Sequence, residues 1–389
     1  MKWLRGLAIA LTAVAVIIGL LWLNRWSVLS IVIEQRGLAE PFVGLTADGT
    51  VRDDLFSLKP GDDRPALRDA VLAYLATLDP EQRAASVFAV DDAEWRKWMN
   101  VHFYKRQGLR LRDATPDQAA AFRKVLEQGL SPYGYRLASD IMKLDTTLAE
   151  LNDNFVEYGE DLFHLTIMGE PSAQEPWGWQ LDGHHLVMNY FTLQGQVVMS
   201  PLFLGAEPVI ARQGVHQGTA VLQDVQDAGL ALMLSLDAEQ QEQARIGEVK
   251  QGNNAQAEFF SDNAIVPLAG IPTGAMQDHQ RAALIALIRT YTGIMRDASA
   301  NAKMSEVLDH LQETHFAWVG GLGEDDAFYY RIQSPVLYIE FDHQRPVGIR
   351  HLLETDAPHR DHVHVVIRTP NGNDYGKNLL AAHLAAQPH

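Results

Sequence analysis

The chain has 389 residues, enough for two or three domains or for one large domain with helical additions. Its 32 basic and 49 acidic residues give a net charge of −17, which argues against a nucleic-acid partner, because phosphate binding needs clustered Lys and Arg. There is no cysteine, which excludes disulfides, thiolate metal ligands and a cysteine nucleophile. Hydrophobic residues make up 47% of the chain, so it can bury a sizeable core.

The N-terminus has the pattern of a membrane anchor. Lys2 and Arg5 form a short basic leader, and Leu7–Leu23 follows as 17 residues without a charge. This length is at the low end for a membrane-spanning helix, and no small-x-small cleavage site follows it. We therefore predict that residues 1–26 are an uncleaved signal anchor, that the membrane is a partner, and that the rest of the chain is exported to the periplasmic or extracellular side. A protein secreted after signal cleavage is the alternative.

The next part of the chain is predicted to be a linker followed by helices. Residues 27–60 contain turn residues and a strand-like piece, Leu29–Ile33. From 61 to 155 the sequence is mainly helical, with apolar residues recurring on one helix face. Three similar helix starts, each with a capping residue and an acid in the first turn, begin at Asp79, Thr115 and Asp237.

Residues 156–385 are predicted to hold a sheet with inserted helices. Strands are expected at 161–168, 184–191, 197–199, 327–332, 336–342 and 362–367, and 170–179 is read as a loop. Helices are expected at 218–235, 238–247, 278–299 and 301–313. Strands mixed with helices out of strict βαβ order predict an α+β fold with a mainly antiparallel or mixed sheet, and 61–385 form one large domain.

The strand at 362–367 carries the strongest functional signal. Side chains alternate along a strand, so His362, His364 and Arg368 share one face, and the intervening Val and Ile residues face a core. Histidines two residues apart on a rigid strand can bind one metal ion. Five histidines lie in the 22 residues from His343 to His364, both included. The alternative is the solvated face of an edge strand.

Two further clusters can contribute to the same site. Glu340 shares a strand face with Tyr338 and Asp342, so a neighbouring strand could bring a carboxylate beside the imidazoles; a solvated acidic face is the alternative. His184 and His185 are adjacent and must face opposite ways on a strand. We favour His185 as the ligand, because its face carries more polar residues than the apolar face of His184.

The segment 369–376 is a tight turn that can serve as a ligand loop. Pro-Asn-Gly forms the turn, and Asn373 and Asp374 stand beside a tyrosine. A purely structural turn, stabilised by its own side-chain hydrogen bonds, is the alternative.

Several of these segments together resemble a known family. They are Gly-His-His-Leu at 183–186, Pro-Leu-Phe-Leu-Gly-Ala-Glu-Pro at 201–208, Phe-Ala-Trp-Val-Gly-Gly at 316–321, Tyr330–Arg331, Ile-Glu-Phe-Asp at 339–342, His362–His364 and 368–376. The set is similar to the bacterial and fungal family catalogued as domain of unknown function 3500, over about residues 60–385. The resemblance implies a shared fold and site but no reaction. Members are often exported, which agrees with the leader.

Two hypotheses of function follow. In the first, the protein is a metal-dependent hydrolase or oxidoreductase: His362 and His364 bind the metal with His185 or His184, Glu340 acts as ligand or general base, and Arg368 neutralises an anionic group. With only nitrogen and oxygen donors, zinc, iron, manganese and copper are all admissible.

In the second hypothesis, the protein is a non-catalytic module that binds a metal, a small molecule or a carbohydrate. The candidate substrate-binding residues are Asn373, Asp374, Tyr330, Arg331 and Trp318, with Trp177, Trp179 and Tyr329 as further aromatic candidates. Three imidazoles converging with a carboxylate would favour the enzyme, and dispersed histidines with exposed coplanar aromatics would favour the binding module.

Overall fold

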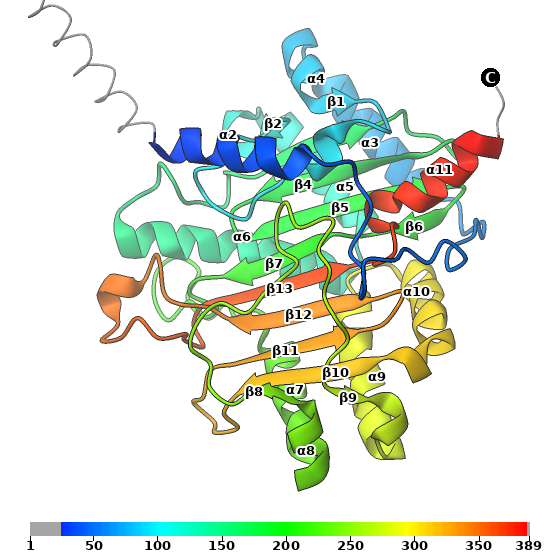
Figure 1. Ribbon diagram of the computed structural model, residues 1–389. Helices are drawn as coiled ribbons and strands as arrows, with labels where there is room; N and C mark the ends of the chain where they lie inside the picture. Colours follow the sequence, from blue (N-terminus) through cyan, green and yellow to red (C-terminus); the bar gives the residue numbers. More distant parts are fainter. Residues whose placement is uncertain (1–24, 387–389) are drawn as a thin grey trace, which may run out of the picture.

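One large twisted sheet organises the structure, a computed structural model that describes residues 25–386 (Figure 1). Its principal strand order is β1-β3-β4-β5-β7-β13-β12-β11-β10-β8, with β2, β6 and β9 paired at its sides. Only β1–β3 and β10–β8 are parallel among the described pairs, which confirms the predicted α+β class with a mainly antiparallel sheet. The strands are β1 (Val87–Phe88), β2 (Leu109–Arg110), β3 (His164–Met168), β4 (Trp177–Gly183), β5 (Leu186–Leu193), β6 (Gln196–Val198), β7 (Leu202–Ala206), β8 (Arg245–Gly247), β9 (Ile271–Pro272), β10 (His315–Gly320), β11 (Phe328–Gln333), β12 (Tyr338–His343) and β13 (Val363–Arg368).

Ten α-helices surround the sheet in the described part of the chain. They are α2 (Arg25–Leu38), α3 (Pro65–Thr77), α4 (Pro80–Ser86), α5 (Pro116–Gly129), α6 (Pro132–Asn152), α7 (Gln223–Ser235), α8 (Ala238–Ala244), α9 (Asp278–Thr292), α10 (Asp297–Asp309) and α11 (Lys377–Ala386). The three predicted helix starts are confirmed: Asp79, Thr115 and Asp237 each accept a hydrogen bond from a first-turn amide, and a glutamine completes each capping box.

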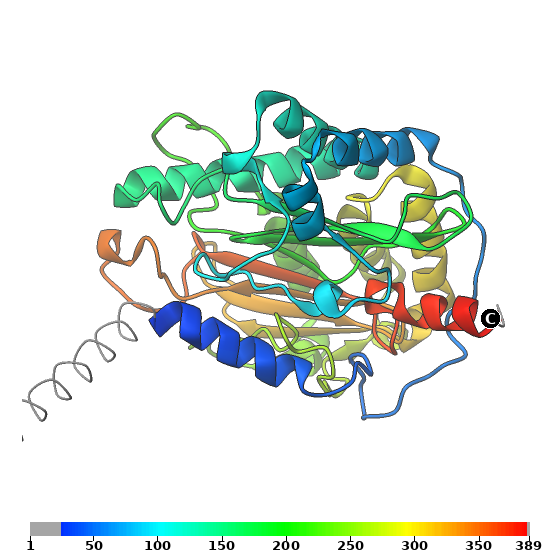
Figure 2. The same ribbon diagram turned by 90° about the horizontal axis from the view of Figure 1, so that it is seen from above.

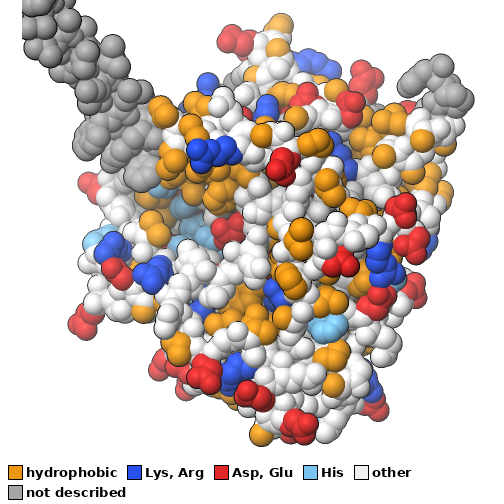
Figure 3. Space-filling model, in the orientation of Figure 1, with side chains coloured by type: hydrophobic (Ala, Val, Ile, Leu, Met, Phe, Trp, Pro, Cys, Tyr) orange, Lys and Arg blue, Asp and Glu red, His pale blue; other side chains and the backbone are white. Residues whose placement is uncertain are grey.

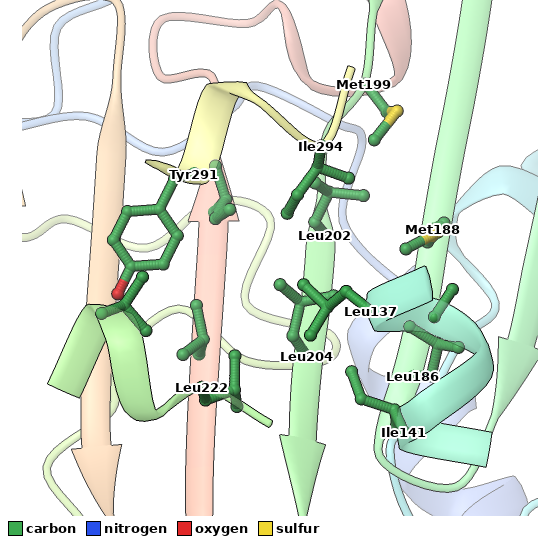
Figure 4. Packing of buried hydrophobic residues seen from close by; sticks show 14 of the residues in the cluster. Leu137, Ile141, Leu186, Met188, Met199, Leu202, Leu204, Leu222, Tyr291 and Ile294 are labelled. Carbon is green, nitrogen blue, oxygen red and sulfur yellow. The ribbon is translucent and has the colours of Figure 1, made fainter. Parts of the chain in front are cut away.

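The two faces of the sheet carry different cores. On one face, α3, α5, α6, α7, α9 and α10 cover the largest apolar cluster. Figure 4 shows Leu137 and Ile141 of α6 close to Leu186 of β5 and Leu204 of β7 in this cluster. The other face is covered by α11, by the loop at 250–266 and by the segment around Trp95 and Trp98. Figure 2 shows α2 on this second side of the sheet, opposite α6.

The predicted alternation along the strand at 362–367 is confirmed. Val363, Val365 and Ile367 belong to the helix-covered cluster, whereas Val366 belongs to the cluster on the other face. In β12, the partner of His364 is Asp342 and the partner of Val366 is Glu340. Glu340 therefore lies on the neighbouring strand and on the same face as His364, as the sequence pattern predicted.

Other boundaries differ from those predicted. The segment Leu29–Ile33 is part of α2 and not a strand; buried Ser30, and the Tyr104 hydroxyl that donates to Glu34 (2.6 Å), hold one side of this helix against the domain. Such tertiary contacts override the strand preference of β-branched residues. Strand β4 begins inside the predicted loop at 170–179, and β1, β2, β7, β8, β9 and β10 were not predicted. The helix predicted at 238–247 ends at Ala244, where β8 follows. The helix predicted at 278–299 ends at Thr292, and α10 follows after a short turn.

The predicted signal anchor lies almost wholly outside the described residues. Within residues 25–386, no helix is both long and apolar enough to cross a membrane.

Candidate metal centre

Three histidines from two distant parts of the chain converge at one edge of the sheet. His362 directly precedes β13, His364 is its second residue, and His185 lies in the turn between β4 and β5. Nε2 of His362 lies 3.3 Å from Nε2 of His185 and 3.0 Å from Nε2 of His364. One nitrogen of each ring lies within 4.8 Å of those of the other two, and the three residues are 4–8% exposed. Two nitrogens bound tetrahedrally to zinc at about 2.0–2.1 Å would be about 3.3 Å apart, which is close to this spacing.

The hydrogen-bond partners of Nδ1 in His362 and His364 determine which state their Nε2 atoms adopt. Nδ1 of His362 lies 2.6 Å from the carbonyl oxygen of Arg345, which can only accept, so this Nδ1 carries the hydrogen. Nδ1 of His364 lies 2.7 Å from Oε1 of Glu258, which accepts in the same way when ionised. Nε2 of each neutral ring is then an acceptor. Two acceptors 3.0 Å apart repel unless a cation or a proton lies between them.

A second proton on either ring is unfavourable near neutral pH. Burial lowers the pKa of His362 to about 4 and that of His364 to about 3, and burial also lowers the pKa of His185 well below its usual value. The neutral imidazole is the form that binds metal ions. Burial therefore keeps all three side chains in their ligating state.

The backbone is shaped to bring His185 to this point. His185 has a left-handed conformation (φ 60°), which is uncommon for a residue other than glycine. Its amide donates to the carbonyl of Asn100 (3.2 Å), and its carbonyl accepts from the amide of Gly205 (2.7 Å). A Cβ at Gly205 would lie 3.3 Å from Cδ2 of both His185 and His364 and 2.7 Å from the carbonyl oxygen of Val363. Glycine therefore leaves room for two imidazoles side by side.

A carboxylate reaches the centre from a loop that sequence reasoning did not identify. Glu258 lies in the segment between β8 and β9, and its side chain is 23% exposed. Burial raises the pKa of Glu258 to about 7, and the nearby His362 opposes this shift. A carboxylate on the outer nitrogen of a ligating histidine orients the ring and increases its basicity. Glu258 is thus placed to position His364.

The predicted cluster of polar residues on β12 and β13 anchors this loop. Glu340 accepts hydrogen bonds from the amides of Gln256 and Ala257 and from the hydroxyl of Tyr329. Arg368 is fully buried and donates to the carbonyl oxygens of Ala257 (2.9 Å) and Glu258 (2.8 Å). Glu340 and Arg368 therefore both contact the loop that carries Glu258. Neither residue is part of the possible metal-binding group, which consists of His185, His362 and His364.

Asp342, two residues after Glu340, binds the same loop. Asp342 accepts from the amides of Asn254 (2.6 Å) and Ala255 (3.0 Å) and pairs with Lys250 (2.8 Å). Asp342, Glu340 and Arg368 are thus three sheet residues that hold a long irregular segment against the sheet through its backbone groups. A buried loop needs such partners because its amides and carbonyls cannot reach water.

His184 is separated from the centre although it is adjacent to His185. Its Nδ1 lies 2.5 Å from Oδ1 of Asp145 on α6, and its ring stacks on His185 at 3.9 Å. The prediction that favoured His185 over His184 agrees with this arrangement. Both residues occupy the turn between β4 and β5, so strand alternation was not the physical reason.

The predicted substrate-binding residues are dispersed. Trp318 and Tyr330 belong to the core on the helix-covered face, opposite the histidines, and both are fully buried. Arg331 donates to the carbonyl of Pro267 (3.0 Å). Asp374 accepts from the amide of Thr369 (2.8 Å) and pairs with Arg368 (3.2 Å).

The remaining aromatic and polar candidates do not form a groove either. Trp177 and Trp179 are buried in the same core, and Tyr329 is buried against Glu340. Asn373 is buried, and its Oδ1 accepts from the amide of Leu379 (3.4 Å) in the structural turn before α11.

A second acid holds the segment that covers the other side of the centre. Glu207 follows β7, and its carboxylate accepts from the amides of Val347 (2.7 Å) and Gly348 (2.8 Å). It lies 3.7 Å from Nδ1 of His362. Glu207 and Gly205 stand within the segment 201–208 that marks the family resemblance, which was the only sequence signal for them. Glu258 had no such signal.

The comparisons with known proteins agree with the resemblance found in the sequence. The sequence signature described as Protein of unknown function (DUF3500) matches residues 61–377, which is most of the chain and includes all three histidines, Glu207 and Glu258. Neither a curated protein nor a solved structure matches the chain. The chain therefore belongs to the DUF3500 family of proteins of unknown function.

Proposed function

We propose that the protein is a metal-dependent enzyme whose ion is bound by His185, His362 and His364. The observation that carries the proposal is the convergence of three buried Nε2 atoms, two of them 3.0 Å apart. The carbonyl of Arg345 fixes Nε2 of His362 as an acceptor, and Nε2 of His364 is also an acceptor when Glu258 is ionised, so the two nitrogens then repel each other. A divalent cation turns this repulsion into attraction. The family has no established reaction, so the choice between hydrolysis and redox chemistry rests on which ion is bound.

The donor set narrows that choice by its chemistry. Three neutral imidazoles suit zinc, copper or iron better than magnesium or calcium, which prefer oxygen ligands. Three protein ligands also leave a coordination position free for a water molecule or a substrate, as in catalytic zinc sites. When bound there, the metal would supply Lewis-acid chemistry, or electron transfer if it is redox-active. Glu258 would orient His364, and the carbonyl of Arg345 would orient His362.

The burial of the aromatic candidates argues against a carbohydrate-binding module. Such a groove needs exposed aromatic faces, and Trp177, Trp179, Trp318 and Tyr330 are all buried. A non-catalytic metal carrier remains the competing proposal. It predicts bound metal without turnover of any substrate.

Elemental analysis of the purified full-length protein, with titration against a chelator, tests the site. We expect one equivalent of a transition metal per chain in the wild type and its loss in His362→Ala. The matched control is His184→Ala, which removes a neighbouring imidazole that is paired with Asp145 and is not part of the triad. Wild-type metal content in His362→Ala, or equal losses in both variants, would contradict the site. Turnover of ester, phosphoester or redox probes by the metal-loaded protein, abolished in His362→Ala, separates the enzyme from the carrier.

We further propose that the domain is exported and held at the membrane by residues 1–26, with secretion after cleavage as the alternative. The proposal is supported by the basic leader and by the 17 uncharged residues of Leu7–Leu23. Fractionation of cells that express the full chain tests it, because an anchored protein stays with membranes after a carbonate wash and a cleaved one is released.

A further inference from the structure

Exposed apolar side chains gather along one edge of the molecule. The start of α2, the end of α6 and the segment around the short helical turn at Arg350–Leu352 lie side by side at the left edge of both ribbon views (Figures 1 and 2). Large hydrophobic residues in these segments are 37–82% exposed: Val28, Leu29, Ile31, Val32, Phe155, Val156, Val347 and Leu352. Isolated exposed apolar residues are ordinary, but eight of them in three adjoining segments indicate an interaction surface.

The first of these segments is an amphipathic helix with a clear orientation. Val28, Leu29, Ile31 and Val32 occupy one exposed face of α2, whereas Ser30 is buried. Glu34, one turn further along, binds the hydroxyl of Tyr104 in the domain. The exposed apolar face is therefore confined to the first turns of the helix, nearest the N-terminus.

The sequence before α2 indicates what covers this face. Leu7–Leu23 ends two residues before the start of α2, and its 17 uncharged residues would extend about 25 Å as a helix, close to the thickness of a bilayer core. Amphipathic helices at a membrane surface are immersed by about 5–10 Å. A bilayer bound through Leu7–Leu23 would meet the start of α2 first.

The histidine centre lies beneath the same edge. Figure 3 shows histidine side chains at the bottom of a hollow just below α2, with hydrophobic side chains along its margin. Two other segments lie near the centre. Glu207 binds the amide of Val347 and lies 3.7 Å from His362. The ring of Tyr158, which follows Phe155 and Val156, lies 5.3 Å from that of His184, the residue whose ring stacks on His185. The apolar residues thus stand around the opening and not on a remote surface.

We propose that this edge lies against a lipid bilayer, so that the hollow opens onto the membrane surface and the centre acts on a molecule carried by the membrane. The substrate would have an apolar part that stays in the bilayer and a polar part that reaches the histidines. This last step rests on the proposed function, whereas the contact between the edge and the bilayer does not.

The absence of cysteine allows a direct test with the full-length chain, because one introduced cysteine gives one labelled position. We would introduce cysteine at Ile31 on α2, at Val347 on the opposite margin of the hollow, and at Leu308 of α10 as a control. Leu308 is 42% exposed, similar to Ile31 at 49%, and it belongs to α10, which lies on the opposite side of Figure 1 from the start of α2. Each variant carries an environment-sensitive fluorophore and is reconstituted into phosphatidylcholine vesicles with brominated acyl chains.

We expect the labels at positions 31 and 347 to lose most of their fluorescence to the brominated lipid, and the label at 308 to keep most of its own. Quenching at 31 without quenching at 347 would overturn the proposal, because the hollow would then face away from the bilayer. Equal quenching at all three positions would overturn it as well. A separate sample carries pyrene at position 347 and should show no excimer emission. Strong excimer emission would mean that a second copy of the chain covers this edge instead of the bilayer.

These results are independent of the metal. Quenching at 31 and 347 in a protein that binds no metal would leave the membrane surface in place and remove the proposed enzyme. A metal-loaded protein with no quenching at 347 would keep the metal centre and remove the proposed membrane surface.

Discussion

The role assigned to Glu258 leads to the sharpest prediction about the centre. Its carboxylate lies 2.7 Å from Nδ1 of His364 and makes no hydrogen bond to the other two histidines. Removing it in Glu258→Ala should leave the three ligands present but free one ring to rotate. We expect the metal affinity to fall by about 10- to 100-fold, the range typical of such outer partners.

The magnitude agrees with the hydrogen bond itself. A bond to a charged group contributes about 1.5–3 kcal/mol, and the 23% exposure of the Glu258 side chain reduces this because water competes for the carboxylate. About 1.4–2.7 kcal/mol corresponds to one to two orders of magnitude in affinity. Glu258→Gln keeps an oxygen that can accept from Nδ1 but removes the charge, so its loss should be the smaller of the two.

Competition with a chromophoric chelator measures the affinity, and denaturant unfolding of the metal-free variants measures the fold. Because the side chain of Glu258 is half-buried and only its backbone carbonyl binds Arg368, the free energy of unfolding should change by less than about 1 kcal/mol. Unchanged affinity in Glu258→Ala would refute the positioning role. So would equal losses of affinity and stability, because they would show that the loop, and not the carboxylate, matters.

Three further predictions concern packing and pH. Val365→Ala removes two methyl groups from a fully buried side chain on the helix-covered face, so denaturant titration should show about 1–3 kcal/mol of lost stability with unchanged metal content per folded chain. Gly205→Ala places a Cβ against two ligand imidazoles and should weaken metal binding in the chelator assay, whereas Gly252→Ala, where a Cβ would meet nothing within 4 Å, should not. Burial lowers the pKa of His164 to about 4, so the unfolded chain takes up this proton first and the folded state loses stability as the pH falls from about 6.5 towards 4. In His164→Gln, urea titrations should show up to about 2 kcal/mol less destabilisation between pH 7 and about 5; an unchanged pH dependence would exclude His164 as its source.

The hydrogen bonds of the polar residues around the centre explain why few of them are available as candidate ligands. The buried carboxylates of Glu340 and Asp342 bind backbone amides of the loop at 254–257, and the guanidinium of Arg368 binds its carbonyls. These residues bind the segment that carries Glu258 and do not belong to the group of three histidines. A sheet face rich in charge can thus support a site indirectly, by satisfying an irregular loop.

Local patterns in the sequence determined the elements whose physics is local. Capping at Asp79, Thr115 and Asp237 depends on side chains three residues apart, and alternation along β13 depends on strand geometry alone, so both were predictable and are confirmed. The same alternation placed His362 and His364 together. The α+β class also followed from the order of such patterns.

Tertiary structure decided everything that depended on partners far away in the sequence. Leu29–Ile33 became helical because α2 docks on the domain, although its residues favour a strand. His185 joined the centre through a left-handed turn residue, and Glu258 joined it through a loop 106 residues from His364, which no local pattern marks. A metal centre requires its ligands to meet at one point in space, and only the register of β7, β12 and β13 with the loop packed over them determines which side chains reach that point.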